Sequence, residues 1–141
     1  MMADMDYRAI LYHKQATSAR LRFLMFAHSS VCAFEPIPTL AQALAGRQEN
    51  PALHPAPVVK QLEQELGFAT GTLRAEEGYR FLVEVPDRNI QILLIAIESI
   101  DPPFELAERI GGRFIDLTQA RGLPPVELEL LRGAYELVLG G

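Results

Sequence analysis

The sequence contains a single cysteine, Cys32, among its 141 residues. One thiol cannot form a disulfide within the chain, and this is typical of proteins from a reducing compartment. We therefore predict a cytoplasmic location. A chain of this length can bury a sizeable core without disulfides or metals, so we expect one domain over residues 1–141.

Long hydrophobic runs are also missing. The apolar run at residues 21–27 is short, whereas a helix needs about 20 apolar residues to cross a bilayer. We therefore predict no association with a membrane.

Positive charge is scarce as well. The chain has 13 lysines and arginines against 18 acidic residues, giving a net charge of −5. Because this charge opposes phosphate backbones, we predict no nucleic-acid binding. Lys14 and Lys60 are the only lysines, and the excess of arginine indicates a bacterial source with a GC-rich genome.

Motifs for metals and cofactors are absent from the sequence. His13, His28 and His54 lie in separate segments, without the spacing of a zinc or metalloprotease motif. The pair Gly111 and Gly112 is placed to end a helix, whereas a phosphate-binding loop begins one. We predict no metal site and no cofactor.

Residues 79–97 carry the clearest structural pattern. Apolar and polar residues alternate over 79–85, as in a strand with one buried face. A turn follows at 86–89. Residues 90–97 are apolar except for Gln91, which predicts a central strand covered on both faces. With a strand at 68–75, these segments predict a three-stranded meander.

The remaining strands and the helices are predicted from shorter patterns. Residues 7–12 and 20–27 predict a first hairpin, although residues 18–28 also fit a helix, and residues 113–117 fit a short strand. Four helices are expected, at 39–46, at 57–66, at 101–110 with Asp101 as N-cap, and after Pro124 with Tyr135 on its buried face. Residues 47–57 hold three prolines without periodicity, which predicts a mobile loop.

These elements predict an α+β domain. Its mostly antiparallel sheet would have five or six strands, built from two hairpins and the meander, with about four helices packed on it. Such a sheet leaves an edge to protect, and pairing of edges across a two-fold axis predicts a homodimer.

The candidate chemical residues fall into two groups. His28, Cys32 and Glu35 lie after a predicted strand, where loops tend to carry function. Glu98 and Asp101 follow the apolar strand, where a carboxylate can be partly desolvated. The structural alternatives are a buried Cys32, a solvated Glu98 and an Asp101 that caps its helix.

Two functions are compatible with this sequence. The favoured hypothesis is a non-catalytic module that binds a protein partner or a small apolar ligand, because no convergent set of polar residues stands out. The alternative is a small enzyme with a site near His28, Cys32 and Glu35, together with Glu98 and Asp101.

Overall fold

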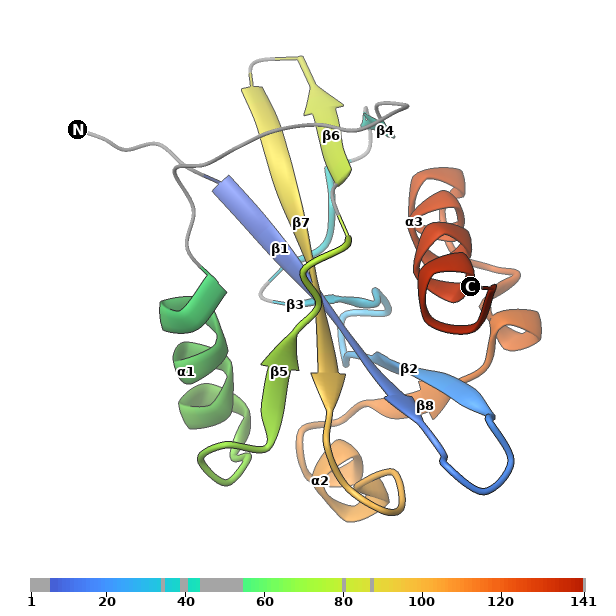
Figure 1. Ribbon diagram of the computed structural model, residues 1–141. Helices are drawn as coiled ribbons and strands as arrows, with labels where there is room; N and C mark the ends of the chain where they lie inside the picture. Colours follow the sequence, from blue (N-terminus) through green and yellow to red (C-terminus); the bar gives the residue numbers. More distant parts are fainter. Residues whose placement is uncertain are drawn as a thin grey trace.

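The computed structural model describes residues 6–33, 35–38, 41–43, 55–79, 81–86 and 88–140. They form an α+β fold in which a mixed eight-stranded sheet has helices on both faces (Figure 1). The strands are β1 (Asp6–Lys14), β2 (Leu21–Met25), β3 (Cys32–Ala33), β4 (Gln42–Ala43), β5 (Leu73–Ala75), β6 (Phe81–Val85), β7 (Arg88–Ile97) and β8 (Arg113–Ile115). The helices are α1 (Pro55–Leu66), α2 (Phe104–Arg109) and α3 (Pro125–Tyr135), with a short 3₁₀ helix, η1 (Leu117–Ala120), before α3 and a π-helical turn, η2 (Glu136–Gly140), after it.

The two longest strands, β1 and β7, are neighbours at the centre of the sheet. They run parallel, in a register that extends from Asp6 opposite Ile90 to Tyr12 opposite Ala96. The other pairings between described strands are antiparallel, and the strand order is β4-β6-β7-β1-β2-β8. β3 continues the edge that β2 occupies on β1, and β5 continues the edge that β6 occupies on β7.

β7 explains why the domain has two cores. Alternate side chains of a strand point to opposite faces, and nearly all of those on β7 are apolar. Ile92 and Leu94 belong to the core under α3, whereas Leu93 and Ile95 belong to the core under α1 and α2. The prediction of a central strand with both faces covered is confirmed.

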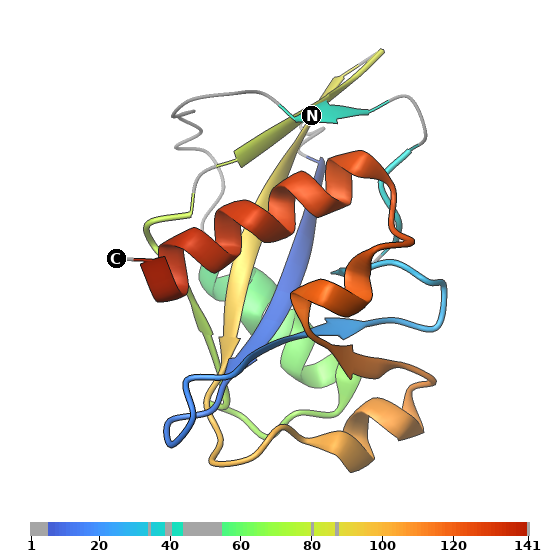
Figure 2. The ribbon, with the colours of Figure 1, turned by 90° about the vertical axis from the view of Figure 1, so that its right-hand side faces the viewer.

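The helices lie on opposite sides of this sheet. Figure 2 shows α3 crossing in front of β7 and β1, with α1 behind them. α1 buries Val58 and Leu62, whereas α3 buries Leu130, Leu131 and Ala134. Each helix therefore covers its own half of the apolar surface of β7.

The first hairpin, predicted from residues 7–12 and 20–27, is confirmed, and so is the hairpin connection predicted between the strands at 79–85 and 90–97. The hairpin predicted between 68–75 and 79–85 does not form. β1 pairs with β2, so residues 21–25 of the ambiguous segment 18–28 form a strand. The meander is wrong, because β5 pairs with β7 and not with β6. β7 is ten residues long, and β5 and β6 together are needed to pair the backbone along one of its edges. The sheet consequently has more strands than predicted, and its central pair is parallel.

The helix predictions are confirmed in part. The helix predicted at 57–66 is α1, and Gly67 with φ of +89° ends it. The helix predicted at 39–46 is wrong at residues 41–43, because residue 41 is not helical and residues 42 and 43 form β4. Residues 39, 40 and 44–46 lie outside the described residues. Residues 47–54 of the predicted loop also lie outside the described residues. Residues 55–57 are the first turn of α1, so the loop prediction is wrong there.

Two predictions about helix side chains are wrong. Pro103 occupies the N-cap position of α2, and no side chain caps the helix there. Asp101 instead accepts a hydrogen bond from Gln15 Nε2 at 3.1 Å. Tyr135 is 41% exposed, because Leu130, Leu131 and Ala134 take the buried face of α3.

None of the helices formed by the described residues is long and apolar enough to cross a membrane. The homodimer and the cytoplasmic location remain predictions.

Leu94→Asp should prevent folding, because Leu94 is 1% exposed and an unpaired buried charge costs several kcal/mol against a total stability of about 5–15 kcal/mol. Ile100→Asp is the matched control, since Ile100 is 88% exposed. Circular dichroism with thermal melting distinguishes the two. A Leu94→Asp protein that melts cooperatively near the wild-type temperature would show that β7 is not central.

Gly133→Ala should also destabilise the domain. A Cβ at Gly133 would lie 2.6 Å from Phe81 Cζ, so α3 or the ring must shift, at a cost of about 1–3 kcal/mol. A glycine-to-alanine change in an uncrowded helix would stabilise it by about 0.5–1 kcal/mol. Gly122→Ala is the matched control, because the space around a Cβ added at this position is open. In urea unfolding, the denaturant concentration at the midpoint should change little for this variant. A Gly133→Ala midpoint above wild type would contradict the packing of α3 on β6.

Candidate functional site

A pocket of about 270 Å³ lies at the C-terminal end of α1, and we call it the α1 pocket. The β2–β3 turn, the end of α1 and the residue after α2 contribute to its wall. Its lining residues are Phe26, Ala27, His28, Ala33, Glu65, Leu66 and Ile110. Two of these side chains, His28 and Glu65, are of the residue types that serve as general acids and bases in enzymes.

A tight turn between β2 and β3 presents His28. The backbone N–H of Phe26 donates to Ser30 O at 2.8 Å, and that of Ser29 donates to Phe26 O at 2.9 Å. Ser29 has a φ of +67°, a left-handed conformation that costs free energy outside glycine and asparagine. The ring of His28 lies 5.7 Å from that of Phe26 and remains exposed. The turn therefore fixes the backbone at His28 while its imidazole is open to a ligand.

A hydrogen-bonded chain reaches Glu65 from the sheet. Tyr7 Oη donates to Gln61 Oε1 at 3.0 Å, and Gln61 Nε2 donates to Glu65 Oε2 at 2.8 Å. Gln61 and Glu65 are four residues apart, so they lie on one face of α1. Tyr7 packs on the core beneath this helix. This relay orients the Glu65 carboxylate at the pocket.

Another glutamate of the same helix has a structural role. Glu63 is 6% exposed, and its Oε2 accepts hydrogen bonds from the backbone N–H groups of Gly71 and Leu73 at 2.9 and 3.1 Å. These bonds tie the start of β5 to α1. The two carboxylates therefore have different environments, and Glu65 is the one that lines the pocket.

A positive charge lies beside the end of α1. Arg109 Nη2 is 3.7 Å from the position that a Cβ at Gly67 would occupy. Leu66 precedes Gly67 and Ile110 follows Arg109, and both Leu66 and Ile110 line the pocket. A guanidinium group is well suited to an anionic substrate at this edge.

The structure does not bring Cys32 to His28. Cys32 is fully buried in the core on the α3 face of the sheet, whereas the α1 pocket lies on the opposite face. Burial, followed by the nearby negative charge of Glu127, raises the pKa of its thiol well above the ordinary value. Since the thiolate is the nucleophilic form, Cys32 is placed as a packing residue.

Glu127 belongs to a buried network that fixes β3. Ser30 Oγ donates to Glu127 Oε2 at 2.8 Å, and the backbone N–H of Val31 donates to Oε1 at 3.2 Å. Ser30 Oγ also accepts from the backbone N–H of Cys32 at 3.0 Å. This network anchors α3 to the strand that follows the His28 turn.

The other candidate acids lie apart from the α1 pocket. Glu35 is exposed. Glu98 is exposed as well and pairs with Arg74 Nε at 3.1 Å, which agrees with the alternative of a solvated carboxylate. Asp101 bonds to Gln15 in the β1–β2 turn. None of the three lines this pocket.

The pocket supplies an incomplete set of metal ligands. In the parts of the chain that the structure describes, no group of three or more His, Cys, Asp or Glu side chains could hold a metal ion. Buried His13 lies elsewhere, with Nε2 2.8 Å from Ser99 O. We therefore derive no reaction step through a metal.

Sequence reasoning missed Glu65, Gln61 and Tyr7. The four-residue spacing of Gln61 and Glu65 was visible, but glutamine and glutamate are common on solvated helix faces. Which of the acidic residues of α1 faces a cavity depends on where β3 and α2 pack. This packing cannot be predicted from the sequences of β3 and α2 alone.

The same arrangement of a mixed sheet between helices occurs in a solved hydrolase. It is the crystal structure of C. elegans Ap4A hydrolase, which matches with a TM-score of 0.58 over 96% of this chain and 99% of that chain, at 13% sequence identity. At this identity the likeness shows a shared fold. No protein-family model and no curated protein matches the chain.

This likeness overturns the favoured prediction of a non-catalytic binding module. That prediction rested on an apolar domain without a recognisable catalytic motif, whereas the matching structure is that of an enzyme over nearly its whole length. The alternative prediction, a small enzyme, agrees better with this likeness. Its predicted site residues were His28, Cys32, Glu35, Glu98 and Asp101, and of these His28 alone lines the α1 pocket.

Cys32 should resist modification in the folded protein. Its side chain is buried and its pKa is raised, so 5,5′-dithiobis(2-nitrobenzoate) should react at least about 100-fold more slowly in buffer than in 6 M guanidinium chloride. Absorbance at 412 nm follows the reaction. Complete labelling of the native protein within minutes would contradict the position of β3 in the core.

Proposed function

We propose that this chain is a hydrolase whose reaction takes place in the α1 pocket. In this proposal Glu65 is the general base and His28 is the general acid. The observation that carries it is the presence of both side chains in one cavity, with Glu65 oriented by the relay from Gln61 and Tyr7. The fold shared with Ap4A hydrolase supports it.

The proposed reaction adds one water molecule to the substrate. The Glu65 carboxylate takes a proton from water, and the resulting hydroxide attacks the electrophilic atom of the substrate. The bond to the leaving group breaks with its electron pair, and the leaving group takes a proton from the His28 imidazolium. Glu65 then loses its proton to solvent and His28 regains one, which returns both groups to their starting states.

Ap4A is the first substrate to test, because the C. elegans protein is named for it. The phosphates of this compound are negatively charged, and the chain itself has a net charge of −5. A local cation is therefore needed to hold it at the pocket. Arg109 lies beside the end of α1 and would pair with a phosphate there.

Glu65→Gln should lower the rate of hydrolysis by about 100-fold or more, because the amide cannot accept the proton from water. His28→Asn should lower it by a similar factor. Purified protein is incubated with Ap4A, in one series with Mg²⁺ and in another with EDTA, and the products are separated by anion-exchange chromatography.

Glu129→Gln is the matched control. Glu129 is exposed on α3, on the other face of the sheet, so this variant should hydrolyse Ap4A at the wild-type rate. A wild-type rate in Glu65→Gln would rule out its role as base. Absence of turnover by the wild-type protein for Ap4A, p-nitrophenyl phosphate and p-nitrophenyl acetate would refute the hydrolase proposal.

A further inference from the structure

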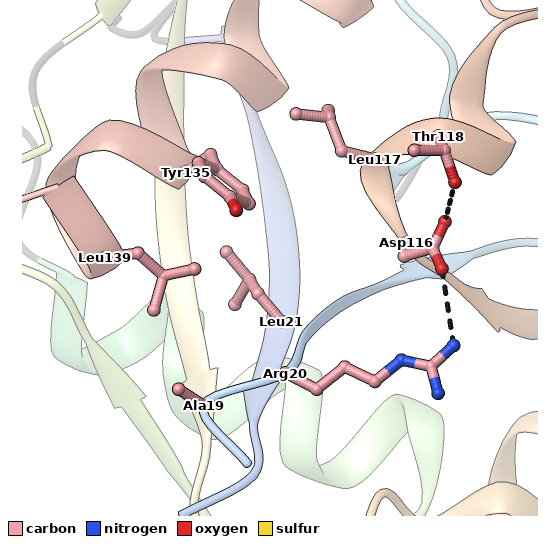
Figure 3. A pocket seen from close by; sticks show the side chains of 8 residues that line it. All are labelled: Ala19, Arg20, Leu21, Asp116, Leu117, Thr118, Tyr135 and Leu139. Atoms are coloured by element: carbon pink, nitrogen blue, oxygen red, sulfur yellow. Dashed lines mark hydrogen bonds and ion pairs between the residues drawn. The ribbon is translucent and has the colours of Figure 1, made fainter.

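A second cavity, of about 370 Å³, opens beside the C-terminal end of α3, and we call it the C-terminal pocket (Figure 3). It lies between the β1–β2 turn, η1 and η2. Its lining residues are Ala19, Arg20, Leu21, Asp116, Leu117, Thr118, Tyr135 and Leu139. Leu21, Leu117 and Leu139 pack on the α3-side core, whereas the α1 pocket adjoins the other core.

The inner part of this pocket is apolar. Figure 3 shows Leu21 and Leu139 beside Tyr135, and Leu117 on the η1 side of the pocket near Asp116 and Thr118. Tyr135 is 41% exposed, whereas Ala134 before it is buried. The aromatic ring therefore presents a surface that a ligand could cover, with a hydroxyl group beside it.

The outer part of the pocket is a polar rim with balanced charge. Arg20 Nη2 lies 3.3 Å from Asp116 Oδ2, and Thr118 Oγ1 donates to Asp116 Oδ1 at 2.7 Å. The hydroxyl of Thr118, followed by the backbone N–H of Gln119, lowers the pKa of the Asp116 carboxyl, so this group is ionised at neutral pH. Its negative charge offsets that of Arg20.

Arg20 retains hydrogen-bonding capacity at the rim. A guanidinium group has five N–H donors, and the bond to Asp116 uses one nitrogen. Because Arg20 lines the pocket, its remaining donors are available to an acceptor on a ligand at the rim. Because Asp116 already neutralises the arginine and would repel an anion, an uncharged acceptor suits this rim better than a carboxylate or a phosphate.

We propose that the C-terminal pocket binds a neutral, planar heteroaromatic molecule of one or two rings, with a hydrogen-bond acceptor at its edge. The ring packs between Tyr135 and the three leucines, and the acceptor bonds to Arg20. This proposal does not depend on the hydrolase activity, since none of the residues assigned to that reaction lines this pocket.

Quinoline is a suitable probe, because it is uncharged at pH 8 and has a nitrogen acceptor at the edge of two fused rings. Titration of the ¹⁵N-labelled chain should give saturable shifts of the backbone amides around Arg20, Leu117 and Tyr135. Quinoline-2-carboxylate, the charged comparator, should bind more weakly because of Asp116.

Tyr135→Ala should weaken quinoline binding about tenfold, since it removes the aromatic face. Arg20→Gln should weaken it as well. Leu137→Ala is the matched control, because Leu137 is an exposed apolar residue of the same segment that does not line the pocket, and its variant should bind like wild type.

Three outcomes would overturn the proposal. They are the absence of saturable shifts at millimolar quinoline, shifts confined to residues outside this pocket, and unchanged binding in both Tyr135→Ala and Arg20→Gln. Tighter binding of the carboxylate than of quinoline would also refute it, because it would make the ligand an anion.

Discussion

The parallel pairing of β1 with β7 is the constraint on which the rest of this structure depends. These strands share seven consecutive register positions, and the side chains of β7 are apolar on both faces. A central pair of this kind must be covered on both sides, since either uncovered face would expose a row of large aliphatic side chains. α1 and α2 cover one face and α3 covers the other, and the domain therefore has two cores and two separate surfaces where helices meet strands.

The α1 pocket follows from that arrangement. α1 lies over the sheet beside β1, which allows Tyr7 at the start of this strand to reach Gln61 in the middle of the helix. The next helical turn places Glu65 at the pocket, and the short β2–β3 turn places His28 on the facing wall. The proposed pair of Glu65 and His28 needs side chains held by rigid elements, and here the sheet supports both the relay and the turn. The ion pair between Arg74 and Glu98 and the hydrogen bond between Gln15 and Asp101, at the far end of β7, are exposed contacts outside this pocket.

Much of the local structure could be predicted from the sequence, because it depends on nearby residues. The continuous apolar run of β7, the turn before it and the amphipathic pattern of α1 each specify an element. Their long-range arrangement could not be predicted in the same way. Nothing in residues 6–14 indicates a parallel partner more than eighty positions away, and residues 73–75 pair with β7 only because β6 stops short of its end. The site shows the same division. The sequence indicates His28 as a candidate in a loop, whereas Cys32, four residues later, lies on the opposite face of the sheet. Glu65 can be told apart from Glu63 only in the folded structure, where Glu63 accepts hydrogen bonds from the backbone N–H groups of Gly71 and Leu73.

We propose that substrate binds in the α1 pocket and not at another surface. The first measurement to make is a titration of ¹⁵N-labelled Glu65→Gln protein with Ap4A in the presence of Mg²⁺, followed by its amide chemical shifts, because this variant should bind without rapid turnover. We expect the largest shifts in the β2–β3 turn around His28, at the end of α1 around Gly67 and at Arg109. Shifts confined to the C-terminal pocket or to the exposed end of β7, or no shifts at millimolar Ap4A, would contradict it.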